Sequence, residues 1–230
     1  MTTPTVLSQD DELLIKWLPG TSRNLVLAFT GIRHQLGGLP MDEFIGTASD
    51  SASNHVLFIS DLKRSWYSSA RLMDKIVEAV TGFIAKHNIA NTAAIGNSMG
   101  GYGAILFAEL LPVSKVVAFA PQVSMHPTVL LETRWIKHRP YFGADLPPSL
   151  APAIARSKAD FFLFFGINSE ADAAHAALLS RQPRLSLFTL QNCGHDVGAF
   201  LKNAGLLTPV FADIFNANVI GLPRILKGYM

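Results

Sequence analysis

The sequence has little of several features that mark other classes of protein. Its single cysteine, Cys193, excludes a disulfide within the chain and is compatible with a reducing compartment. Only 16% of the 230 residues are charged, the net charge is +2, and no cluster of lysine and arginine suggests a groove for a polyanion, so no nucleic-acid partner is expected. No apolar run approaches the ~18 residues that cross a bilayer, and the N-terminus lacks the basic and apolar regions of a signal peptide. We therefore expect a cytoplasmic protein with no membrane span.

Motifs for metals and cofactors are missing as well. The seven histidines do not form the His-x-His or His-Glu-x-x-His pattern of a metal hydrolase. Residues 31–38 contain glycines but lack the Gly-x-Gly-x-x-Gly spacing of a dinucleotide-binding loop. We expect neither a metal nor any other cofactor.

What the sequence does have is apolar material in short runs. Hydrophobic residues make up 49% of the chain, which is enough to cover both faces of a sheet. Runs of apolar and β-branched residues bounded by turn residues predict strands. The spacing of Leu72, Ile76 and Val80 predicts a helix that ends in a left-handed cap at His87-Asn88. The alternation predicts an α/β fold, a three-layer, doubly wound and mostly parallel sheet with an antiparallel N-terminal edge, as a single domain over residues 1–230.

The predicted strands are Leu13–Trp17, Leu25–Thr30, Val56–Ser60, Thr92–Gly96, Val116–Ala120, Phe161–Gly166 and Leu185–Leu190. Further helices are predicted from about Gly101 to Leu111, Ala171 to Leu179, Val197 to Lys202 and Pro209 to Phe215.

One stretch departs from this alternation. Between Pro121 and Asp160 the sequence is rich in proline, which excludes a long helix. It also contains the basic and aromatic run from Arg134 to Phe142. Insertions of this length between core strands are more often functional than idle. We predict that residues 121–160 form a small lid-like insertion over the carboxyl edge of the sheet; an outward-facing loop or a dimer contact is the alternative.

The most informative motif is Gly-Asn-Ser-Met-Gly at residues 96–100. It lies between a predicted strand and a predicted helix, which is the context of a nucleophile elbow. Such a turn holds Ser98 in a strained backbone conformation with its hydroxyl above the sheet edge, and the flanking glycines leave room for strand and helix. The start of the helix directs its positive end at any oxyanion formed there. A glycine-rich turn with an incidental serine is the alternative.

A serine nucleophile needs a general base, and that base needs a carboxylate that fixes its tautomer. His195, in the segment Asn-Cys-Gly-His-Asp after the last predicted strand, is the candidate base. Among the histidines it alone combines a preceding glycine with a position at the end of a late strand. This position places an imidazole at the same sheet edge as the elbow.

Two carboxylates, Glu170 and Asp172, follow the predicted strand Phe161–Gly166 and are candidates for the acid. We favour Asp172, because the short aspartate is the commoner third member, and keep Glu170 as the alternative acid. Both residues also have a structural explanation. Ser169 and Asp172 fit a capping box, and Glu170 fits the positive end of the helix.

The order Ser98, acid, His195, each after a successive strand, resembles that of the α/β-hydrolase superfamily. The resemblance covers the chain from about Asn24 to Phe215 and is specific at Gly-Asn-Ser-Met-Gly-Gly and Gly-His. No subfamily is identified, and Asn97 stands where a histidine is commoner.

The resemblance implies an oxyanion hole made by two backbone N–H groups. One belongs to the residue after the nucleophile, here Met99, and the other comes from the loop after an early strand, for which we assign Ile32. A plain turn after the strand is the alternative at Ile32.

Four further residues are candidates for substrate binding. Trp66 and Tyr67 follow another strand and open onto the same edge, where they either line a pocket or pack over a helix start. In the insertion, Trp135 is a candidate to bury an apolar part of the substrate, and Arg134 is a candidate to meet a polar or anionic group.

These observations together predict a serine hydrolase that cleaves a carboxylic ester or thioester of a small to medium substrate through an acyl-enzyme on Ser98. Carboxylesterases and acyl-thioesterases share this triad and differ in pocket shape. The alternative is a non-catalytic binding or assembly module that keeps the fold. The implied partner is a small-molecule ester or thioester, and no oligomeric state is predicted.

Overall fold

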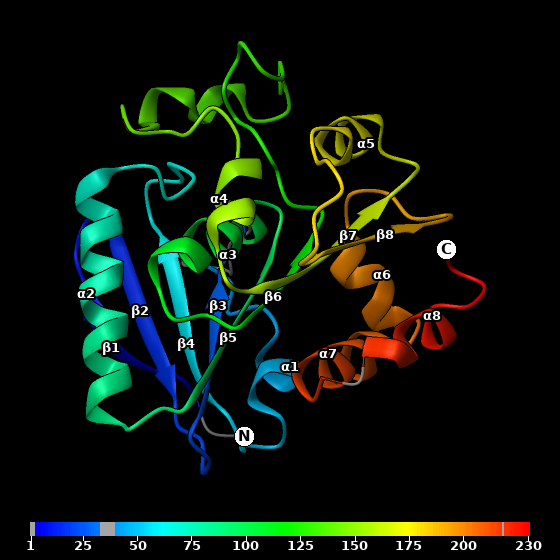
Figure 1. Ribbon diagram of the computed structural model, residues 1–230. Helices are drawn as coiled ribbons and strands as arrows, with labels where there is room; N and C mark the ends of the chain where they lie inside the picture. The colour runs from blue at the N-terminus through cyan, green and yellow to red at the C-terminus, as the bar shows by residue number, and fades with distance from the viewer. Residues whose placement is uncertain (1–2, 33–39, 218) are drawn as a thin grey trace.

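The computed structural model describes residues 3–32, 40–217 and 219–230. Its centre is an eight-stranded sheet with the order β1-β2-β4-β3-β5-β6-β7-β8 (Figure 1). Strand β2 runs antiparallel to both of its neighbours, and every other pairing is parallel. The strands are β1 (Thr5–Gln9), β2 (Leu13–Leu18), β3 (Asn24–Phe29), β4 (His55–Asp61), β5 (Asn91–Asn97), β6 (Lys115–Phe119), β7 (Asp160–Gly166) and β8 (Leu185–Leu190).

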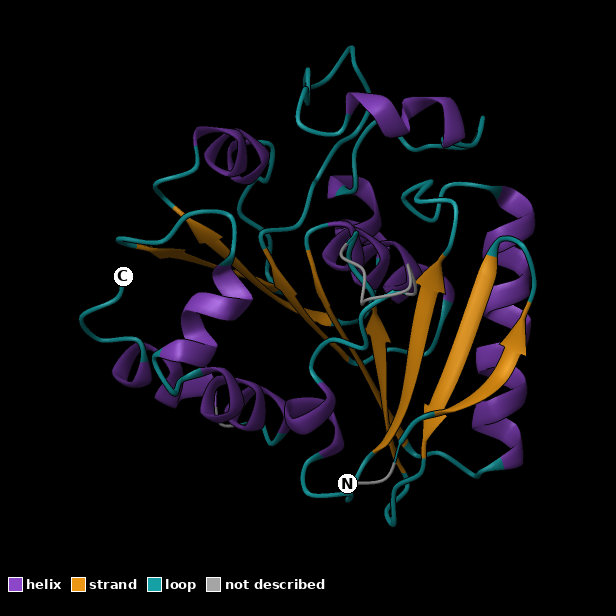
Figure 2. Ribbon diagram, turned by 180° about the vertical axis from the view of Figure 1, so that it is seen from behind, coloured by secondary structure: helices purple, strands orange, loops and turns teal. Residues whose placement is uncertain are grey.

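Helices cover both faces of this sheet (Figures 1 and 2). Helices α2 (Ala70–Lys86), α3 (Met99–Leu110) and α4 (Ala151–Arg156) bury their apolar side chains against one face. The other face is covered by α1 (Ile45–Ser49), α6 (Val197–Asn203), α7 (Leu207–Phe215) and α8 (Leu222–Ile225). The remaining elements are α5 (Glu170–Ala177) and the short 3₁₀ helices η1 (Ile136–Tyr141) and η2 (Val219–Gly221).

The predicted mostly parallel sheet with an antiparallel N-terminal edge is confirmed, and the seven predicted strands correspond to β2 to β8. The helix predicted from Leu72 is α2, and its left-handed cap is Asn88, at φ 50°. Strand β1 was missed, because all of its residues are exposed and only Val6 and Leu7 are apolar, too few for a continuous apolar run. No helix in the described ranges is long and apolar enough to cross a membrane.

The carboxyl ends of the parallel strands point to one edge of the sheet, and residues 121–150 lie over this edge (Figures 1 and 2). These residues contain η1 and otherwise irregular chain. That this segment acts as a lid stays a prediction.

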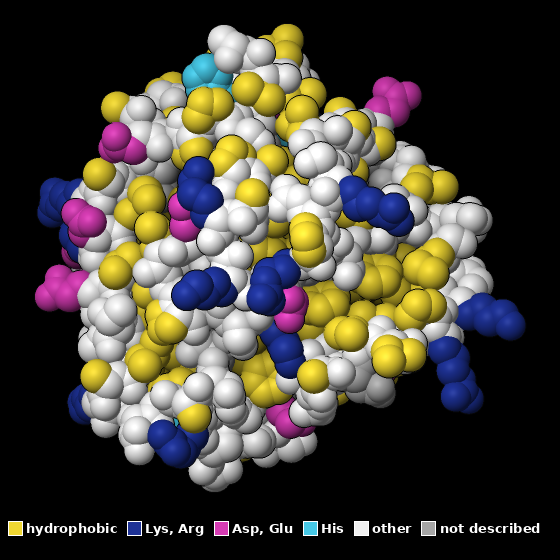
Figure 3. All heavy atoms as spheres, in the orientation of Figure 1, with side chains coloured by type: hydrophobic (Ala, Val, Ile, Leu, Met, Phe, Trp, Pro, Cys, Tyr) yellow, Lys and Arg dark blue, Asp and Glu magenta, His cyan; other side chains and the backbone are white. Residues whose placement is uncertain are grey.

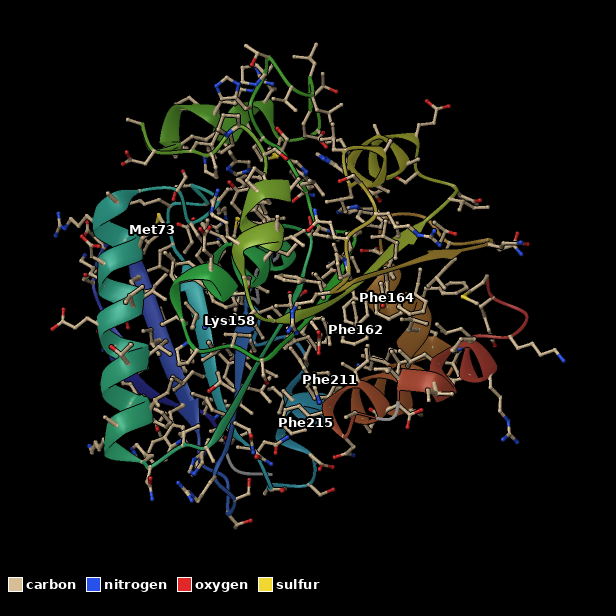
Figure 4. The ribbon with its side chains drawn as sticks, viewed as in Figure 1. Met73, Lys158, Phe162, Phe164, Phe211 and Phe215 are labelled. Carbon is tan, nitrogen blue, oxygen red and sulfur yellow. The ribbon has the colours of Figure 1, made fainter. Side chains whose placement is uncertain are left out.

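A separate apolar hollow lies on the α7 face of the sheet, away from this edge (Figure 3). Phe162 and Phe164 of β7 and Phe211 and Phe215 of α7 lie around it (Figure 4). A shallow cavity of about 390 Å³ extends from Phe162 to the exposed Ile220.

Candidate active site

Ser98 occupies the sharp turn between β5 and α3. Its φ of 55° and ψ of −119° lie outside the ordinary regions for a non-glycine residue, as expected for a nucleophile elbow. The turn is tight enough that a Cβ on Gly96 would overlap the backbone of Gly100, and one on Gly100 would overlap the Phe29 carbonyl. The Ser98 N–H donates to the Phe119 carbonyl at 2.8 Å, which ties the elbow to β6.

His195 contacts Ser98 from the loop between β8 and α6. Its Nε2 lies 2.9 Å from Ser98 Oγ, and its Nδ1 lies 2.9 and 3.0 Å from the two carboxylate oxygens of Asp172. The structure therefore brings the three residues named from the sequence into one hydrogen-bonded series. The imidazole is about a quarter exposed, while Ser98 and Asp172 are buried.

Of the two candidate acids, only Asp172 faces the imidazole. It is the third residue of α5 and is fully buried, whereas Glu170 is exposed. The Asp172 N–H donates to Ser169 Oγ at 3.3 Å, so the expected cap is present, but it uses the backbone of Asp172 and leaves the carboxylate for His195. Burial alone would raise the pKa of Asp172, but the hydrogen bond and charge of His195, together with Arg134, hold it below its ordinary value.

Arg134 of the insertion contacts two carboxylates of the protein. Its Nη1 lies 2.9 Å from Asp172 Oδ1, and its Nε lies 3.0 Å from both oxygens of Glu132. The guanidinium is thus held by two carboxylates of the protein, and its contact with a substrate anion stays a prediction. Nη1 is also 3.3 Å from His195 Nδ1, so a fixed positive charge lies against the His195–Asp172 pair.

Behind Arg134, Glu132 forms a second buried contact. Its Oε2 lies 3.1 Å from Nε2 of His175, whose Nδ1 accepts the Val123 N–H at 3.3 Å. His175 therefore donates from Nε2 to Glu132. Burial would raise the pKa of Glu132, but hydrogen bonds from His175 and Arg134 lower it from 4.5 to about 2.

Trp66 and Tyr67 have no exposed surface, so they do not line an open pocket. The Tyr67 hydroxyl lies within 3.0 Å of the carbonyls of Thr30 and Ile59, which places it in the core between β3 and β4. Both residues have positive φ, near 56°, and the Asp61 carboxylate orders their loop by accepting the Tyr67 N–H at 3.0 Å. The predicted substrate-binding role of Trp66 and Tyr67 is therefore corrected, because both rings pack in the core and leave no surface for a substrate.

Trp135 lies beside the imidazole. Its ring centroid is 6.2 Å from that of His195 and 6.1 Å from that of Trp66. Phe142 of the same segment packs edge-on against Trp66 at 5.2 Å. The insertion thus places aromatic rings next to the candidate base.

The two assigned oxyanion donors lie on neighbouring strand ends. Met99 is the first residue of α3, so its N–H has no partner within the helix. Ile32 follows β3, which pairs with β5 up to Phe29 and Gly96. The preceding N–H, of Gly31, donates to Glu43 at 3.0 Å. Their action as an oxyanion hole stays a prediction.

A cavity lies beside Ser98, His195 and Asp172 without including them. It has a volume of about 560 Å³ and is lined by residues of α1, α6 and α7 and of the segment before α1. Asn97 and Asp196, which adjoin Ser98 and His195 in sequence, also line it. Among the residues that the structure describes, no group of three or more His, Cys, Asp or Glu side chains is arranged to hold a metal ion.

Sequence reasoning missed Gln122, Glu132 and His175. Gln122 is fully buried, and its Nε2 donates to Ser98 Oγ at 3.0 Å. It follows β6, so the rule that selected residues after strand ends could have found it. For Glu132 and His175 there was no such signal, because their contacts join an irregular loop to a helix.

No family model matches this sequence, and no curated protein matches it by sequence. Solved structures match the fold, and the three described next are matched over most of both chains. A capsule O-acetyltransferase of Neisseria meningitidis serogroup A is 14% identical, with 89% of this chain and 92% of that chain covered and a TM-score of 0.65. An enol-lactonase of Burkholderia xenovorans LB400 is 12% identical, with 89% and 97% covered and a TM-score of 0.56.

An α/β hydrolase enzyme from the sediment metagenome of the Mar Chica lagoon, Morocco, is 17% identical, with 87% of this chain and 95% of that chain covered and a TM-score of 0.53. At these identities the likeness concerns the fold. The resemblance to the α/β-hydrolase superfamily is therefore confirmed at that level, and the chain has an α/β-hydrolase fold with no subfamily assigned.

Proposed function

We propose that this protein is a serine hydrolase that cleaves a carboxylic ester or thioester through an acyl-enzyme on Ser98. The observation that carries the proposal is the series Ser98 Oγ, His195 and Asp172, with contacts of 2.9 to 3.0 Å at both ends of the imidazole. A serine and a base within hydrogen-bond reach, with the base oriented by a third group, is the arrangement that nucleophilic catalysis needs.

In the proposed reaction, Ser98 Oγ attacks the substrate carbonyl while His195 Nε2 takes its proton. Collapse of the tetrahedral intermediate expels the alcohol or thiol, which receives that proton from the imidazolium. Water then attacks the acyl-enzyme as His195 takes its proton, the bond from Oγ to the acyl carbon breaks, and the carboxylic acid leaves while His195 returns the proton to Ser98. Asp172 keeps Nδ1 protonated throughout, and the N–H groups of Met99 and Ile32 hold the oxyanion.

Ser98 is a better candidate nucleophile than the one thiol. Cys193 is buried, and burial raises its pKa to about 11, so it remains a neutral thiol at physiological pH. 

The test is stoichiometric labelling with a fluorophosphonate, followed by mass spectrometry of the labelled peptide. We expect the probe to modify Ser98 and to stop the turnover of p-nitrophenyl acetate. Ser98→Ala should abolish both the labelling and the turnover, with little change in thermal stability. Ser180→Ala, at an exposed serine, is the matched control. An inert Ser98 in folded protein would instead identify a non-catalytic binding or assembly module.

A second candidate is acyl transfer to a hydroxyl in place of water. It is favoured by the match to the O-acetyltransferase, which spans nearly the whole of both chains. The two reactions share the acyl-enzyme and differ in the acceptor. Partition of the acyl group between water and added alcohols distinguishes them, because a transferase gives mostly ester product at alcohol concentrations far below that of water.

A further inference from the structure

Gln122 joins the proposed nucleophile to a buried tryptophan. Its Nε2 lies 3.0 Å from Ser98 Oγ, and its Oε1 lies 3.1 Å from the indole Nε1 of Trp66. Gln122 and Trp66 have no exposed surface, and Ser98 has 4%. A side-chain amide with both ends engaged therefore contacts the oxygen that would attack a substrate, although it belongs to neither the triad nor the assigned oxyanion hole.

The chemistry of Trp66 fixes which way the amide of Gln122 faces. An indole N–H donates and cannot accept, so the atom opposite it must be the carbonyl oxygen of Gln122. The reversed amide would bring two donors together in a site without water access, which carries the cost of an unsatisfied buried group. The NH₂ group of Gln122 therefore faces Ser98, whose oxygen is the acceptor.

The other end of the series is fixed in the same way. The Asp172 carboxylate only accepts, so His195 carries its proton on Nδ1 and presents a bare Nε2. Because Ser98 Oγ accepts from Gln122, its single proton is left for that Nε2. A donor-only indole and an acceptor-only carboxylate thus impose one direction on all four hydrogen bonds from Trp66 to Asp172.

The backbone on both sides holds this bridge in place. The loop that carries Trp66 is ordered by Asp61, which accepts the Ser65 N–H at 2.6 Å. On the other side, Pro121 packs so closely on α3 that a Cβ on Gly101 would lie 3.0 Å from the Pro121 Cβ. The last glycine of Gly-Asn-Ser-Met-Gly-Gly, Gly101, therefore makes room for the turn that brings Gln122 to the nucleophile.

We propose that Gln122 is a catalytic residue that donates a hydrogen bond to Ser98 Oγ and directs the Ser98 proton to His195. The inference rests on the proposed serine chemistry. When Ser98 attacks, the bond from Oγ to the acyl carbon forms as the proton passes to Nε2. When the acyl-enzyme is resolved, that bond breaks, its electron pair returns to Oγ, and the imidazolium gives back the proton. Gln122 stabilises the negative charge that develops on Oγ in this step, and Trp66 is a positioning residue that acts through Gln122.

Two substitutions at Gln122 separate this role from packing. Gln122→Met keeps the length of the side chain and removes the donor. Gln122→Glu keeps the shape, but its carboxylate accepts from both Trp66 and the Ser98 hydroxyl, which turns the proton away from His195. We expect the fluorophosphonate labelling rate and kcat/KM for p-nitrophenyl acetate to fall on the order of 10²-fold in Gln122→Met, and further in Gln122→Glu. If Gln122 only packs, the loss should be smaller in Gln122→Glu than in Gln122→Met, because glutamate has the shape closer to that of glutamine.

Trp66→Phe is the second measurement, and it decides the outcome if Gln122→Glu fails to fold. It keeps a ring in the core but frees the amide to rotate, so kcat should fall about tenfold, the worth of one hydrogen bond, with KM unchanged. Gln9→Met on the exposed strand β1 is the control. If wild-type Ser98 is labelled and the folded Gln122 and Trp66 variants react like wild type, the role of Gln122 is wrong and the serine hydrolase stands. If wild-type Ser98 is inert, both proposals fail.

Discussion

Arg134 binds the carboxylate of Asp172 at 2.9 Å, on the side chain that also meets the imidazole of His195. The candidate acid is thus shared between the base and a guanidinium. Arg134 is held in turn by Glu132, and both belong to the segment over the carboxyl edge of the sheet. This segment therefore supplies a charge to the site in addition to aromatic rings.

Replacing Arg134 tests this contact. Arg134→Met removes the second anchor of Asp172 and leaves Glu132 without its cation, so the His195–Asp172 pair loses its fixed geometry. We expect kcat to fall by up to about 10²-fold, the scale of a small misplacement of catalytic groups, with KM little changed. Arg134→Lys keeps the charge but cannot bind both carboxylates in the same geometry. Its kcat should therefore lie between those of Arg134→Met and wild type. Equal kcat for Arg134→Met and wild type would assign the contact to structure alone.

The choice of acid gives a second prediction. Asp172→Asn should lower turnover on the order of 10⁴-fold, because an amide favours the wrong tautomer of the imidazole, as in serine proteases. Glu170→Gln is the matched control and should leave turnover unchanged, since Glu170 is exposed. Steady-state kinetics with p-nitrophenyl acetate measures both. A large loss of turnover in Glu170→Gln, together with a small loss in Asp172→Asn, would instead make Glu170 the acid.

The lowered pKa of Glu132 predicts a pH dependence of stability. A carboxyl whose pKa falls from 4.5 to about 2 on folding contributes stability that is fully present above pH ~4.5 and is lost as the pH falls toward 2. Glu132→Gln lacks this contribution. The free energy of unfolding of wild type should therefore exceed that of Glu132→Gln at pH 6, and the gap should narrow by roughly 2 kcal/mol by pH 2.5.

Urea unfolding at several pH values measures this gap. Glu78→Gln, at an exposed position of α2, is the control and should show no comparable narrowing. A constant difference between wild type and Glu132→Gln would mean that the contacts with His175 and Arg134 do not stabilise the charged carboxylate.

Trp135 provides a test of the lid prediction. Because its ring lies beside His195, Trp135→Ala should change the ratio of kcat/KM between short and long acyl esters far more than it changes the melting temperature. Ile136→Ala, at a neighbouring side chain with 57% exposure, should leave the ratio unchanged. If Trp135→Ala leaves the acyl preference unaltered, residues 121–160 have a structural role and do not select the substrate.

The core of the fold was predictable because its strands are covered on both faces, and two-sided burial leaves a continuous apolar run in sequence. Ser98, Asp172 and His195 could be brought together for a related reason. They follow β5, β7 and β8, whose carboxyl ends lie at one edge of the sheet, so chain order and strand direction were enough. Strand β6 lies between β5 and β7 and supplies Gln122 to the same edge.

Loop contacts were not predictable in this way. Arg134 lies near Glu132 in sequence, but its contact with Asp172 spans 38 residues and depends on the path of an irregular segment. Trp66 and Tyr67 follow a strand end, as Ser98, Asp172 and His195 do, and nothing in the sequence distinguishes a ring that faces a pocket from one that packs in the core. Their burial follows from the left-handed turn at Arg64, Trp66 and Tyr67, a conformation unusual for these residue types.

The elbow ties the backbone conformation of Ser98 to the pairing of the central strands. The backbone conformation of Ser98 costs of order 1–3 kcal/mol in isolation, and it persists because Gly96, Gly100 and the Phe29 carbonyl leave no room to relax. The hydrogen bond from Ser98 to Phe119 ties the same residue to β6. The serine therefore has no local route out of its strained state while β3, β5 and β6 remain paired. If Ser98 reacts with a covalent probe as proposed, loss of that labelling and global unfolding should therefore follow the same denaturation curve.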